Sequence, residues 1–316
     1  GEEILRIADC DDFSFVDVDF IGHEISDDTF LQKHIDAVLA LKLVDKQAIL
    51  DAGFSVAIDC VNSVGGMAIP ALLEQLGVKT IHKLYCEPNG QFPHNPEPLP
   101  EHLTDISNLI QQVKADVGFV VDPDVDRLAI ICENGAMFGE EYTLVSIADY
   151  VLSQTPGNTV SNLSSTRALR DITQKHGQQY MASAVGEVNV VEKMKAAGAV
   201  IGGEGNGGII YPEIHYGRDA LVGIALFLTQ LAKSKLKVSD LRASYPSYSI
   251  SKNKIELSPS VDMEKLLSEV AEYFNKFDVN TIDGVKIYFP DKWIHLRKSN
   301  TEPIIRIYAE ALTLQE

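Results

Sequence analysis

The sequence predicts an α/β protein, with two tandem α/β domains followed by a small α+β domain at the C-terminus. Apolar runs rich in β-branched residues alternate with amphipathic stretches at helical spacing, which is typical of a parallel α/β sheet. The same alternation starts again after residue 140, so two similar units in tandem are expected. The composition changes near residues 246–252. We therefore expect domains at residues 1–138, 139–246 and 247–316, which suits the length of the chain.

The elements of the first expected domain follow from periodicity and turn residues. Apolar positions at helical spacing predict a helix within residues 24–51. A glycine-rich turn follows the first strand, and Gly77 marks the end of the next helix. A loop rich in Pro and Asn occupies residues 86–100. The other predicted elements are, in order, strand 54–60, strand 78–85, helix 101–115 and strand 117–121.

The same reasoning applies to the second and third expected domains. In the second, strands and helices alternate up to a long amphipathic helix at residues 217–235. Its other predicted elements are helix 141–154, strand 158–163, helix 166–177, strand 179–185, helix 188–198 and strand 199–203. The third begins with a strand after the change in composition, and continues with helix 262–277 and strands 285–289, 293–298 and 304–311.

Charge and composition argue against several kinds of partner. The net charge is 27 − 45 = −18 and no Lys and Arg cluster occurs, whereas nucleic-acid binding needs a basic stripe, so no nucleic-acid partner is expected. The longest apolar run beside a helix, 220–228, is far shorter than the ~20 residues of a membrane span, so no membrane contact is expected. Four scattered cysteines and the lack of a signal-peptide pattern predict a cytoplasmic protein with reduced thiols.

Three carboxylates stand two residues apart between two apolar stretches that read as strands. Asp122, Asp124 and Asp126 lie in the run G-F-V-V-D-P-D-V-D-R-L. Carboxylate oxygens are hard donors, and three of them with few neutral ligands suit Mg²⁺. Clustered like charges are costly unless a cation offsets them. Arg127 follows at once, and its guanidinium can hold a carboxylate or a phosphate beside the metal.

Three alternatives compete with a magnesium loop. An EF-hand matches the count from Asp122 to Glu133, but Arg127 stands where the sharp turn needs Gly, and the flanks are strands rather than helices. A haloacid-dehalogenase-like phosphatase begins with strand-D-x-D-x-T/V, and here a third carboxylate occupies the final position. The last alternative is a solvated acidic turn without a ligand.

A glycine-rich run, G-G-E-G-N-G-G at residues 202–208, follows the strand predicted at 199–203. It contains G-x-G-x-x-G, but a dinucleotide site requires a helix next, and the following I-I-Y-P-E-I is strand-like. Because the flanking glycines carry no side chains, the side chains of Glu204 and Asn206 can instead project from the loop. A carboxylate can accept hydrogen bonds from two vicinal sugar hydroxyls, and an amide both donates and accepts. A plain glycine-rich turn is the alternative.

A third polar run lies between two predicted strands, in R-K-S-N-T-E-P-I-I-R. Its two guanidiniums, two hydroxyls and turn N–H groups match a phosphate dianion. A polar hairpin turn is the alternative. A metal loop and a phosphate loop in one chain indicate phosphoryl chemistry. The candidate residues of this run are Arg297, Ser299, Asn300, Thr301 and Arg306.

Together and in this order, the three runs resemble those of the α-D-phosphohexomutases, which include phosphoglucomutases, phosphomannomutases and phosphoglucosamine mutases. D-P-D-x-D-R-L looks like the family's metal loop, G-G-E-G-N-G-G like its sugar loop and R-K-S-N-T-E-P-x-x-R like its phosphate loop. The resemblance covers nearly the whole chain. It implies a four-domain protein in which the first three domains share an α/β topology, and this chain corresponds to the second, third and fourth.

The resemblance also implies an activity and its partners. The enzyme would interconvert a hexose or hexosamine 6-phosphate and its 1-phosphate through a phosphoserine and a hexose 1,6-bisphosphate. Mg²⁺ would bind to the three aspartates, with Arg127 supporting them. Glu204 and Asn206 would bind the sugar hydroxyls, and the run from Arg297 to Arg306 would bind the non-reacting phosphate. Arg218 and Asp219 are expected to be structural.

Two departures from the family pattern matter. The first domain would carry the phosphoserine in a T-A-S-H-N-P-like segment, and the similar H-N-P at residues 94–96 follows Pro93 rather than Ser. We therefore expect a fragment that is inactive alone and whose partner is the missing N-terminal catalytic domain of the same polypeptide. Gly208 also replaces the usual His of the sugar loop, and His215 is expected to have no catalytic role.

The form of the sugar loop favours glucosamine phosphate or glucose phosphate as substrate, because G-E-G-N-G-G looks like the phosphoglucosamine mutase and phosphoglucomutase sequences of archaea and some bacteria. Two other functions remain open. One is a Mg²⁺-dependent phosphatase with an aspartyl-phosphate intermediate, and the other is a non-catalytic phosphosugar-binding module.

Overall fold

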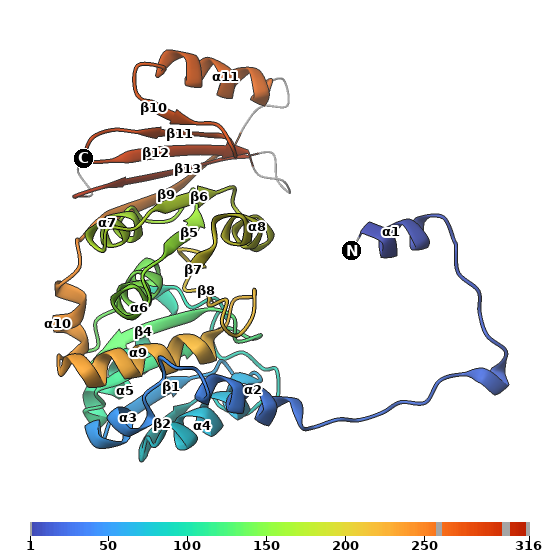
Figure 1. The fold of residues 1–316 in the computed structure, drawn as a ribbon, viewed down its shortest axis with the longest axis vertical. Coiled ribbons are helices and arrows are strands. Elements are labelled where there is room, and N and C mark those ends of the chain that lie inside the picture. The colour runs from blue at the N-terminus through green and yellow to red at the C-terminus, as the bar shows by residue number, and fades with distance from the viewer. Residues whose placement is uncertain (1, 257–260, 299–303, 314–316) are drawn as a thin grey trace. The chain divides into compact units, whose positions relative to one another are not determined.

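The structure, a computed structural model, describes residues 2–256, 261–298 and 304–313. The chain divides into two units, residues 1–34 and residues 35–316. The first unit (blue in Figure 1) contains α1 (Glu2–Asp9), a 3-10 helix (Val18–Phe20) and the start of α2 (Phe30–Leu39). The second unit contains three sheets. Among the described helices, none is long and apolar enough to cross a membrane.

The first sheet has the strand order β2-β1-β3-β4. β1 is parallel to both β2 and β3, and β4 is antiparallel to β3. Every residue of β3 and β4 is buried, in line with their continuous apolar sequence. The elements of this part of the chain are α3 (Lys46–Ala52), β1 (Ser55–Asp59), α4 (Gly65–Leu76), β2 (Thr80–Leu84), a 3-10 helix (Pro100–His102), α5 (Thr104–Val113), β3 (Val117–Val121) and β4 (Leu128–Cys132).

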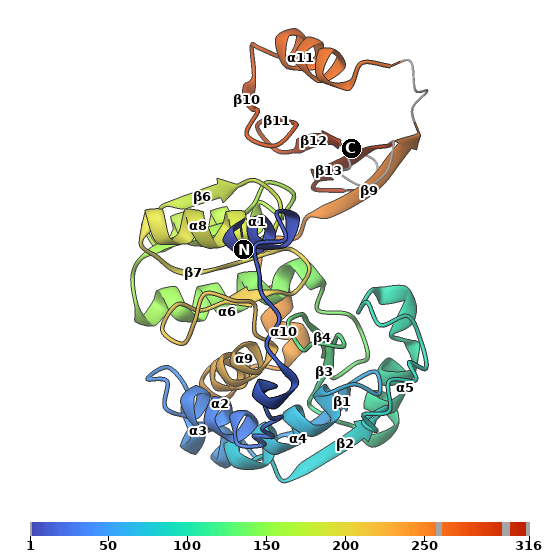
Figure 2. The ribbon, with the colours of Figure 1, turned by 90° about the vertical axis from the view of Figure 1, so that its right-hand side faces the viewer.

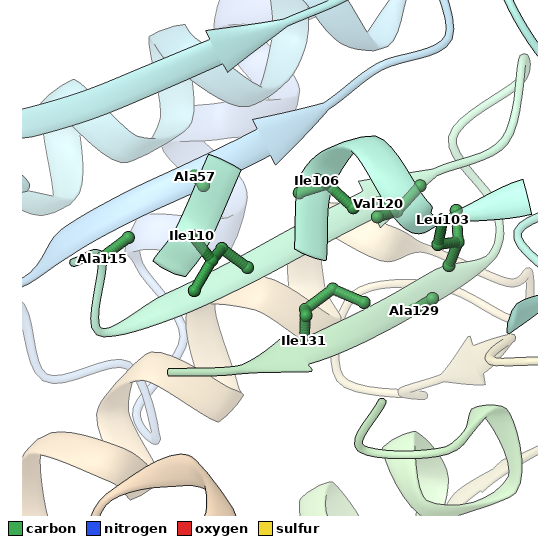
Figure 3. Packing of buried hydrophobic residues seen from close by; sticks show 8 residues of the cluster. All are labelled: Ala57, Leu103, Ile106, Ile110, Ala115, Val120, Ala129 and Ile131. Atoms are coloured by element: carbon green, nitrogen blue, oxygen red, sulfur yellow. The ribbon is translucent and has the colours of Figure 1, made fainter. Parts of the chain in front are cut away.

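Helix α5 packs closely on one face of this sheet. A Cβ atom at Gly118 would lie 2.4 Å from Cδ1 of Ile110, so a side chain here would require the Ile110 side chain to shift. Figure 3 shows Ile106 and Ile110 of α5 over the strands, among the buried residues Ala57, Leu103, Ala115, Val120, Ala129 and Ile131. The opposite face is covered by α9 (Ala220–Ser234), whose Phe227 ring centroid lies 6.1 Å from that of Phe119.

The second sheet repeats the topology of the first, with the order β6-β5-β7-β8 and an antiparallel last strand. This confirms the two tandem α/β units. The β3–β4 and β7–β8 connections therefore occupy equivalent positions. α6 contacts both β4 and β7, and α9 contacts both β4 and β8, so these two helices join the sheets. The new elements are α6 (Glu140–Gln154), β5 (Asn158–Asn162), α7 (Ala168–Lys175), β6 (Tyr180–Ser183), α8 (Glu187–Ala197), β7 (Ala199–Gly203) and β8 (Ile209–Ile210).

The third sheet is antiparallel throughout, with the order β10-β11-β12-β13-β9. Figure 1 shows α11 over one of its faces, where Phe274, Phe277 and Phe289 form an aromatic cluster. Figure 2 shows the chain passing from α10 into β9, an edge strand of this sheet. The elements are α10 (Val238–Ala243), β9 (Ser249–Glu256), α11 (Met263–Tyr273), β10 (Asp278–Asn280), β11 (Val285–Tyr288), β12 (Trp293–Lys298) and β13 (Ile304–Ala311).

The structure confirms the predicted fold class and corrects three details. The two α/β sheets are mixed rather than parallel, because each ends in a hairpin. The single helix expected within residues 24–51 is wrong, since α2 ends at Leu39 and α3 starts after Asp45, whose carboxylate accepts the Ala48 N–H at 3.0 Å as an N-cap. The short elements α10 and β10 were not predicted. The domain boundaries at residues 138 and 246 stay predictions.

Candidate functional site

The acidic loop, residues 122–127, is the turn of the β3–β4 hairpin. Oδ1 of Asp122 accepts hydrogen bonds from the backbone N–H groups of Asp126 and Arg127, both at 3.0 Å. Val125 has a φ of 62°, which is strained for a β-branched residue. Its carbonyl accepts the Ala220 N–H at 3.1 Å. These bonds fix a backbone in which alternate carboxylates can converge.

The three predicted metal ligands do converge. One carboxylate oxygen from each of Asp122, Asp124 and Asp126 lies within 4.8 Å of the others. Burial raises the pKa of Asp122, and burial together with the charge of Asp122 raises the pKa of Asp126 to about 7. Oδ1 of Asp126 is buried and has no hydrogen-bond partner among the described residues. An acceptor-only oxygen of this kind fits a hard cation such as Mg²⁺.

Arg218 connects the acidic loop with the glycine loop. Its Nη2 lies 2.5 Å from Oδ2 of Asp126, and its Nη1 lies 3.3 Å from Oε2 of Glu204. Its backbone N–H donates to Oε1 of Glu187 at 3.0 Å. Arg218 was expected to be structural, and that expectation stays a prediction, although its guanidinium contacts two candidate site residues at once.

The glycine loop is the turn of the equivalent β7–β8 hairpin. Glu204 is buried, and its Oε1 accepts a hydrogen bond from Nδ2 of Asn162 at 2.8 Å. The Gly205 N–H donates to Oγ of Ser165 at 3.1 Å. A Cβ atom at Gly205 would lie 2.1 Å from Oε2 of Glu141, so this position accepts only glycine unless Glu141 moves. The glycine thus serves close packing rather than a dinucleotide.

Glu141 lies beneath this loop at the start of α6. Its Oε2 accepts the Thr166 N–H at 2.8 Å. Burial raises its pKa to about 8, and the nearby charge of Lys252 acts in the opposite direction. Protonation of the carboxyl group is therefore favoured near neutral pH, in contact with the glycine loop.

One cavity of roughly 390 Å³ is lined by residues of all three predicted runs, but Asp122, Asp124 and Asp126 are not among its lining residues. Arg127, Glu204, Asn206, Arg297 and Arg306 all line it. Ser299, Asn300 and Thr301 lie outside the described residues. Side chains and backbone that the sequence analysis did not single out complete the wall: Glu97, Leu99, Glu140, Glu141, Asn162, Ser164, Val185, Gly205, Lys252 and Tyr308.

Arg127 stands between the acidic loop and this cavity. Its Nε lies 3.6 Å from Oδ2 of Asp122, and its Nη1 lies 2.9 Å from Oε1 of Glu97. Glu97 belongs to the loop rich in Pro and Asn that precedes α5. The predicted metal cluster therefore adjoins the cavity through Arg127.

The C-terminal sheet contacts the connection between β5 and α7 through buried polar groups. Nζ of Lys286 donates to the Leu163 carbonyl at 2.5 Å, and Glu310 accepts the Arg167 N–H at 3.0 Å. Nδ1 of His295 lies 3.1 Å from Oγ of Ser164. Burial lowers the pKa of Lys286 to about 7 and that of His295 to about 4. The connection therefore contacts both the glycine loop and the C-terminal sheet.

Asn162, Glu141 and Lys252 were not predicted from the sequence, although a signal for Asn162 was present. Asn162 ends β5, and polar residues at the carboxyl ends of parallel strands commonly line ligand crevices. No comparable signal marks Glu141 or Lys252, because their positions depend on contacts between distant segments. His215 lies 2.9 Å from Oδ2 of Asp219, the residue that caps α9, and it is absent from the residues that line the cavity.

Two mixed α/β domains, an antiparallel C-terminal domain and a shared cavity with an acidic trio at its side define the class of protein. The chain belongs to the phosphoglucomutase/phosphomannomutase family. Sequence models of that family match in order: "alpha/beta/alpha domain II" at residues 32–135, "alpha/beta/alpha domain III" at residues 139–248 and "C-terminal domain" at residues 258–316.

Curated relatives agree with this assignment. The chain is 30% identical over 315 residues to a "Probable phosphoglucosamine mutase" of Methanopyrus kandleri, with 98% of this chain and 68% of that protein covered. It is 34% identical over 292 residues to a "Phosphoglucomutase/phosphomannomutase" of Thermococcus kodakarensis, with 91% and 63% covered. The chain thus spans about two thirds of the length of these relatives.

Solved structures show the same fold. A phosphoglucomutase/phosphomannomutase family protein from Burkholderia thailandensis superposes with a TM-score of 0.84 at 25% identity, covering 100% of this chain and 67% of that one. An Aspergillus fumigatus N-acetylphosphoglucosamine mutase, solved with GlcNAc-6P and magnesium, superposes with a TM-score of 0.60 at 14% identity, covering 90% and 66%.

Proposed function

We propose that these residues form the metal-, sugar- and phosphate-binding part of a phosphohexomutase. The enzyme would interconvert a hexose or hexosamine 6-phosphate and its 1-phosphate through a phosphoserine and a 1,6-bisphosphate. The observation that carries this proposal is the single cavity lined by residues of all three loops, which come from three separate parts of the chain. A solvated turn or a plain hairpin would have no reason to share a cavity with the others.

In this proposal, the acidic trio of Asp122, Asp124 and Asp126 holds Mg²⁺. The metal ion, when bound, offsets the charge of the phosphoryl group and orients its oxygens. Arg127 lies within ion-pair distance of Asp122 and also lines the cavity, so its guanidinium can support the metal loop or contact the phosphoryl group.

The sugar would be recognised by Glu204 and Asn206. Asn162 and Arg218 each bind one carboxylate oxygen of Glu204, which fixes the direction of its remaining lone pairs. A carboxylate held in this way can accept hydrogen bonds from two vicinal hydroxyls. Such contacts suit both orientations of the sugar, because the reaction requires the intermediate to turn over.

The phosphate remote from the reaction would bind to Arg297 and Arg306, together with Ser299, Asn300 and Thr301. The two arginines are direct partners on β12 and β13, so their guanidiniums lie on one face of the sheet. Paired guanidiniums bind a phosphate dianion through charge-assisted hydrogen bonds. We propose that the phosphoserine comes from a segment outside these 316 residues.

The substrate proposed is glucosamine phosphate or glucose phosphate. The sequence of the glycine loop favours this choice, and relatives named as phosphoglucosamine mutases and phosphoglucomutases are among those most similar to the chain. Calorimetric titration of the purified chain with glucosamine 6-phosphate, glucose 6-phosphate and mannose 6-phosphate, each with Mg²⁺, tests it. We expect the weakest binding for mannose 6-phosphate.

A coupled assay tests the origin of the phosphoserine. The purified chain is supplied with glucose 1-phosphate or glucosamine 1-phosphate, Mg²⁺ and the matching 1,6-bisphosphate, and formation of the 6-phosphate is followed. We expect binding without turnover. Turnover by this chain alone would contradict an external serine, and failure of all three sugar phosphates to bind would contradict the proposed function.

A further inference from the structure

Three cationic residues lie side by side across the C-terminal sheet. Arg297 on β12 is directly opposite Arg306 on β13, which is directly opposite Lys254 on β9. Residues paired in this way point to the same face of a sheet, with Cα atoms about 5 Å apart. Like charges directly opposite each other destabilise a sheet, so the row favours a bound anion.

The neighbouring row adds one more cation. Lys252 lies two residues before Lys254 and therefore points to the same face, opposite Tyr308. Its Nζ lies 2.5 Å from Oε1 of Glu140. Lys254, by contrast, forms no ion pair with any carboxylate in the described part of the chain and is exposed. Its charge is thus available to a ligand.

A second cavity of roughly 390 Å³ lies over these residues. Its lining is Lys252, Asn253, Lys254, Ile304, Arg306 and Tyr308. Lys252, Arg306 and Tyr308 also line the cavity that contains Glu204, so the two spaces adjoin. Lys254 lines only the second cavity and extends the positive surface beyond the predicted phosphate loop.

We propose that Lys254, with Lys252, forms a second anion subsite that holds one phosphate of the hexose 1,6-bisphosphate, on the side of Arg306 opposite Arg297. This inference rests on the proposed function. Two strand spacings, about 9.6 Å, separate β12 from β9, which is comparable with a hexose that carries a phosphate at each end. The bisphosphate must reverse its direction between the two transfers, and a second subsite beside the first keeps it bound while it turns.

Binding by the full chain tests this subsite. The dissociation constants of glucose 1,6-bisphosphate and glucose 6-phosphate are measured by calorimetry at fixed ionic strength for the wild type, Lys254→Gln and Lys254→Arg. Lys265→Gln is the matched control, because it removes the same charge from α11 of the same domain. For Lys254→Gln we expect bisphosphate binding to weaken roughly fivefold to tenfold, and 6-phosphate binding by less than about twofold. Lys254→Arg and Lys265→Gln should match the wild type.

The outcomes separate the two proposals. If both ligands bind the wild type and Lys254→Gln weakens both equally or neither, the second subsite does not exist, while the proposed function stands. If the wild type binds neither ligand, the proposed function fails and the subsite fails with it. Equal melting temperatures of wild type and Lys254→Gln exclude a folding defect at this exposed position.

Discussion

At the scale of single residues, the site depends on carboxylates that face one another. Asp122 satisfies one oxygen with two backbone N–H groups, whereas Asp126 keeps a buried oxygen without a hydrogen-bond partner among the described residues. Asp124 is the exposed member of the trio. The three residues thus differ in role, because Asp122 shapes the loop while Asp124 and Asp126 offer oxygens that a cation can take up.

Asp124→Asn tests the metal site with the least effect on the fold. Since affinity for a hard cation depends on the number of charged ligands, we expect the dissociation constant for Mg²⁺ to rise about tenfold or more. Calorimetry with Mg²⁺ measures it, and Asp51→Asn, at an exposed position in α3, is the matched control. Unchanged Mg²⁺ affinity in Asp124→Asn would argue against this trio as the metal site.

We expect the loss of Arg218 to affect both the acidic loop and the glycine loop. Arg218→Met leaves the carboxylates of Asp126 and Glu204 without their shared cation, and removing one partner of buried charges is strongly destabilising. We expect the free energy of unfolding to fall by roughly 2–4 kcal/mol, measured by urea denaturation in the absence of Mg²⁺.

The control for Arg218 is Arg6→Met, which removes an exposed ion pair with Glu3. Surface pairs of this kind contribute about 0–1 kcal/mol, so its effect should be small. Equal losses for the two variants would show that the contacts of Arg218 with both loops carry little energy.

At the scale of elements, two equivalent hairpin turns build the site. The β3–β4 turn carries the acidic trio, and the β7–β8 turn carries Glu204. The turns contact each other directly. The Leu128 N–H donates to the Gly207 carbonyl at 3.1 Å, and the backbones of Arg127 and Gly208 form an isolated antiparallel β-bridge. The repeated topology therefore places the acidic loop and the glycine loop side by side.

Gly205→Ala tests how closely the glycine loop is packed. The new Cβ atom would lie 2.1 Å from the Glu141 carboxylate, so we expect a loss of stability of about 1–3 kcal/mol together with weaker binding of the sugar phosphate. Adding Glu141→Ala removes the obstructing group. In a double-mutant cycle followed by thermal unfolding, the two changes should be less costly together than the sum of each alone.

Gly22→Ala is the control for this cycle, since nothing lies within 4 Å of a Cβ atom placed there. If the losses of stability caused by Gly205→Ala and Glu141→Ala are strictly additive, a shift of the loop relieves the collision between the new Cβ atom and the Glu141 carboxylate.

At the scale of the whole molecule, buried titratable groups link the glycine loop with the C-terminal sheet. At the β5–α7 connection, Asn162 donates a hydrogen bond to Glu204 and the Thr166 N–H donates one to Glu141. The Leu163 carbonyl of the same connection accepts a hydrogen bond from Nζ of Lys286. Since charged groups at such contacts are buried, the stability of the chain should depend on pH near neutrality.

Glu141→Gln tests this dependence. The folded-state pKa of Glu141 is raised by burial from its ordinary value of about 4.5 to about 8. The protonated carboxyl therefore contributes stability that is fully present below pH 4.5 and is lost as pH rises through 8. Gln keeps the acceptor for the Thr166 N–H without titrating. Between pH 5 and pH 8, we expect the unfolding free energy of Glu141→Gln to rise by roughly 2–4 kcal/mol relative to that of the wild type.

Urea denaturation at several pH values measures this shift, and the exposed Glu74→Gln is the matched control, which should follow the wild type at every pH. A pH profile of Glu141→Gln parallel to that of the wild type would contradict a protonated Glu141 in the folded chain.

The sequence by itself determined the fold class, most of the strands and helices in their order, and the position of the three polar runs, because apolar periodicity, glycine turns and carboxylate spacing are local properties of the chain. It could not predict the break between α2 and α3, which depends on a cap at Asp45, or the contacts of Glu141 and Arg218 and the strand partner of Lys254. Only the tertiary structure decided which side chains share a cavity and a sheet face. Those contacts join residues tens to hundreds of positions apart, and burial and strand register, which set their charges and distances, exist only after the chain has folded.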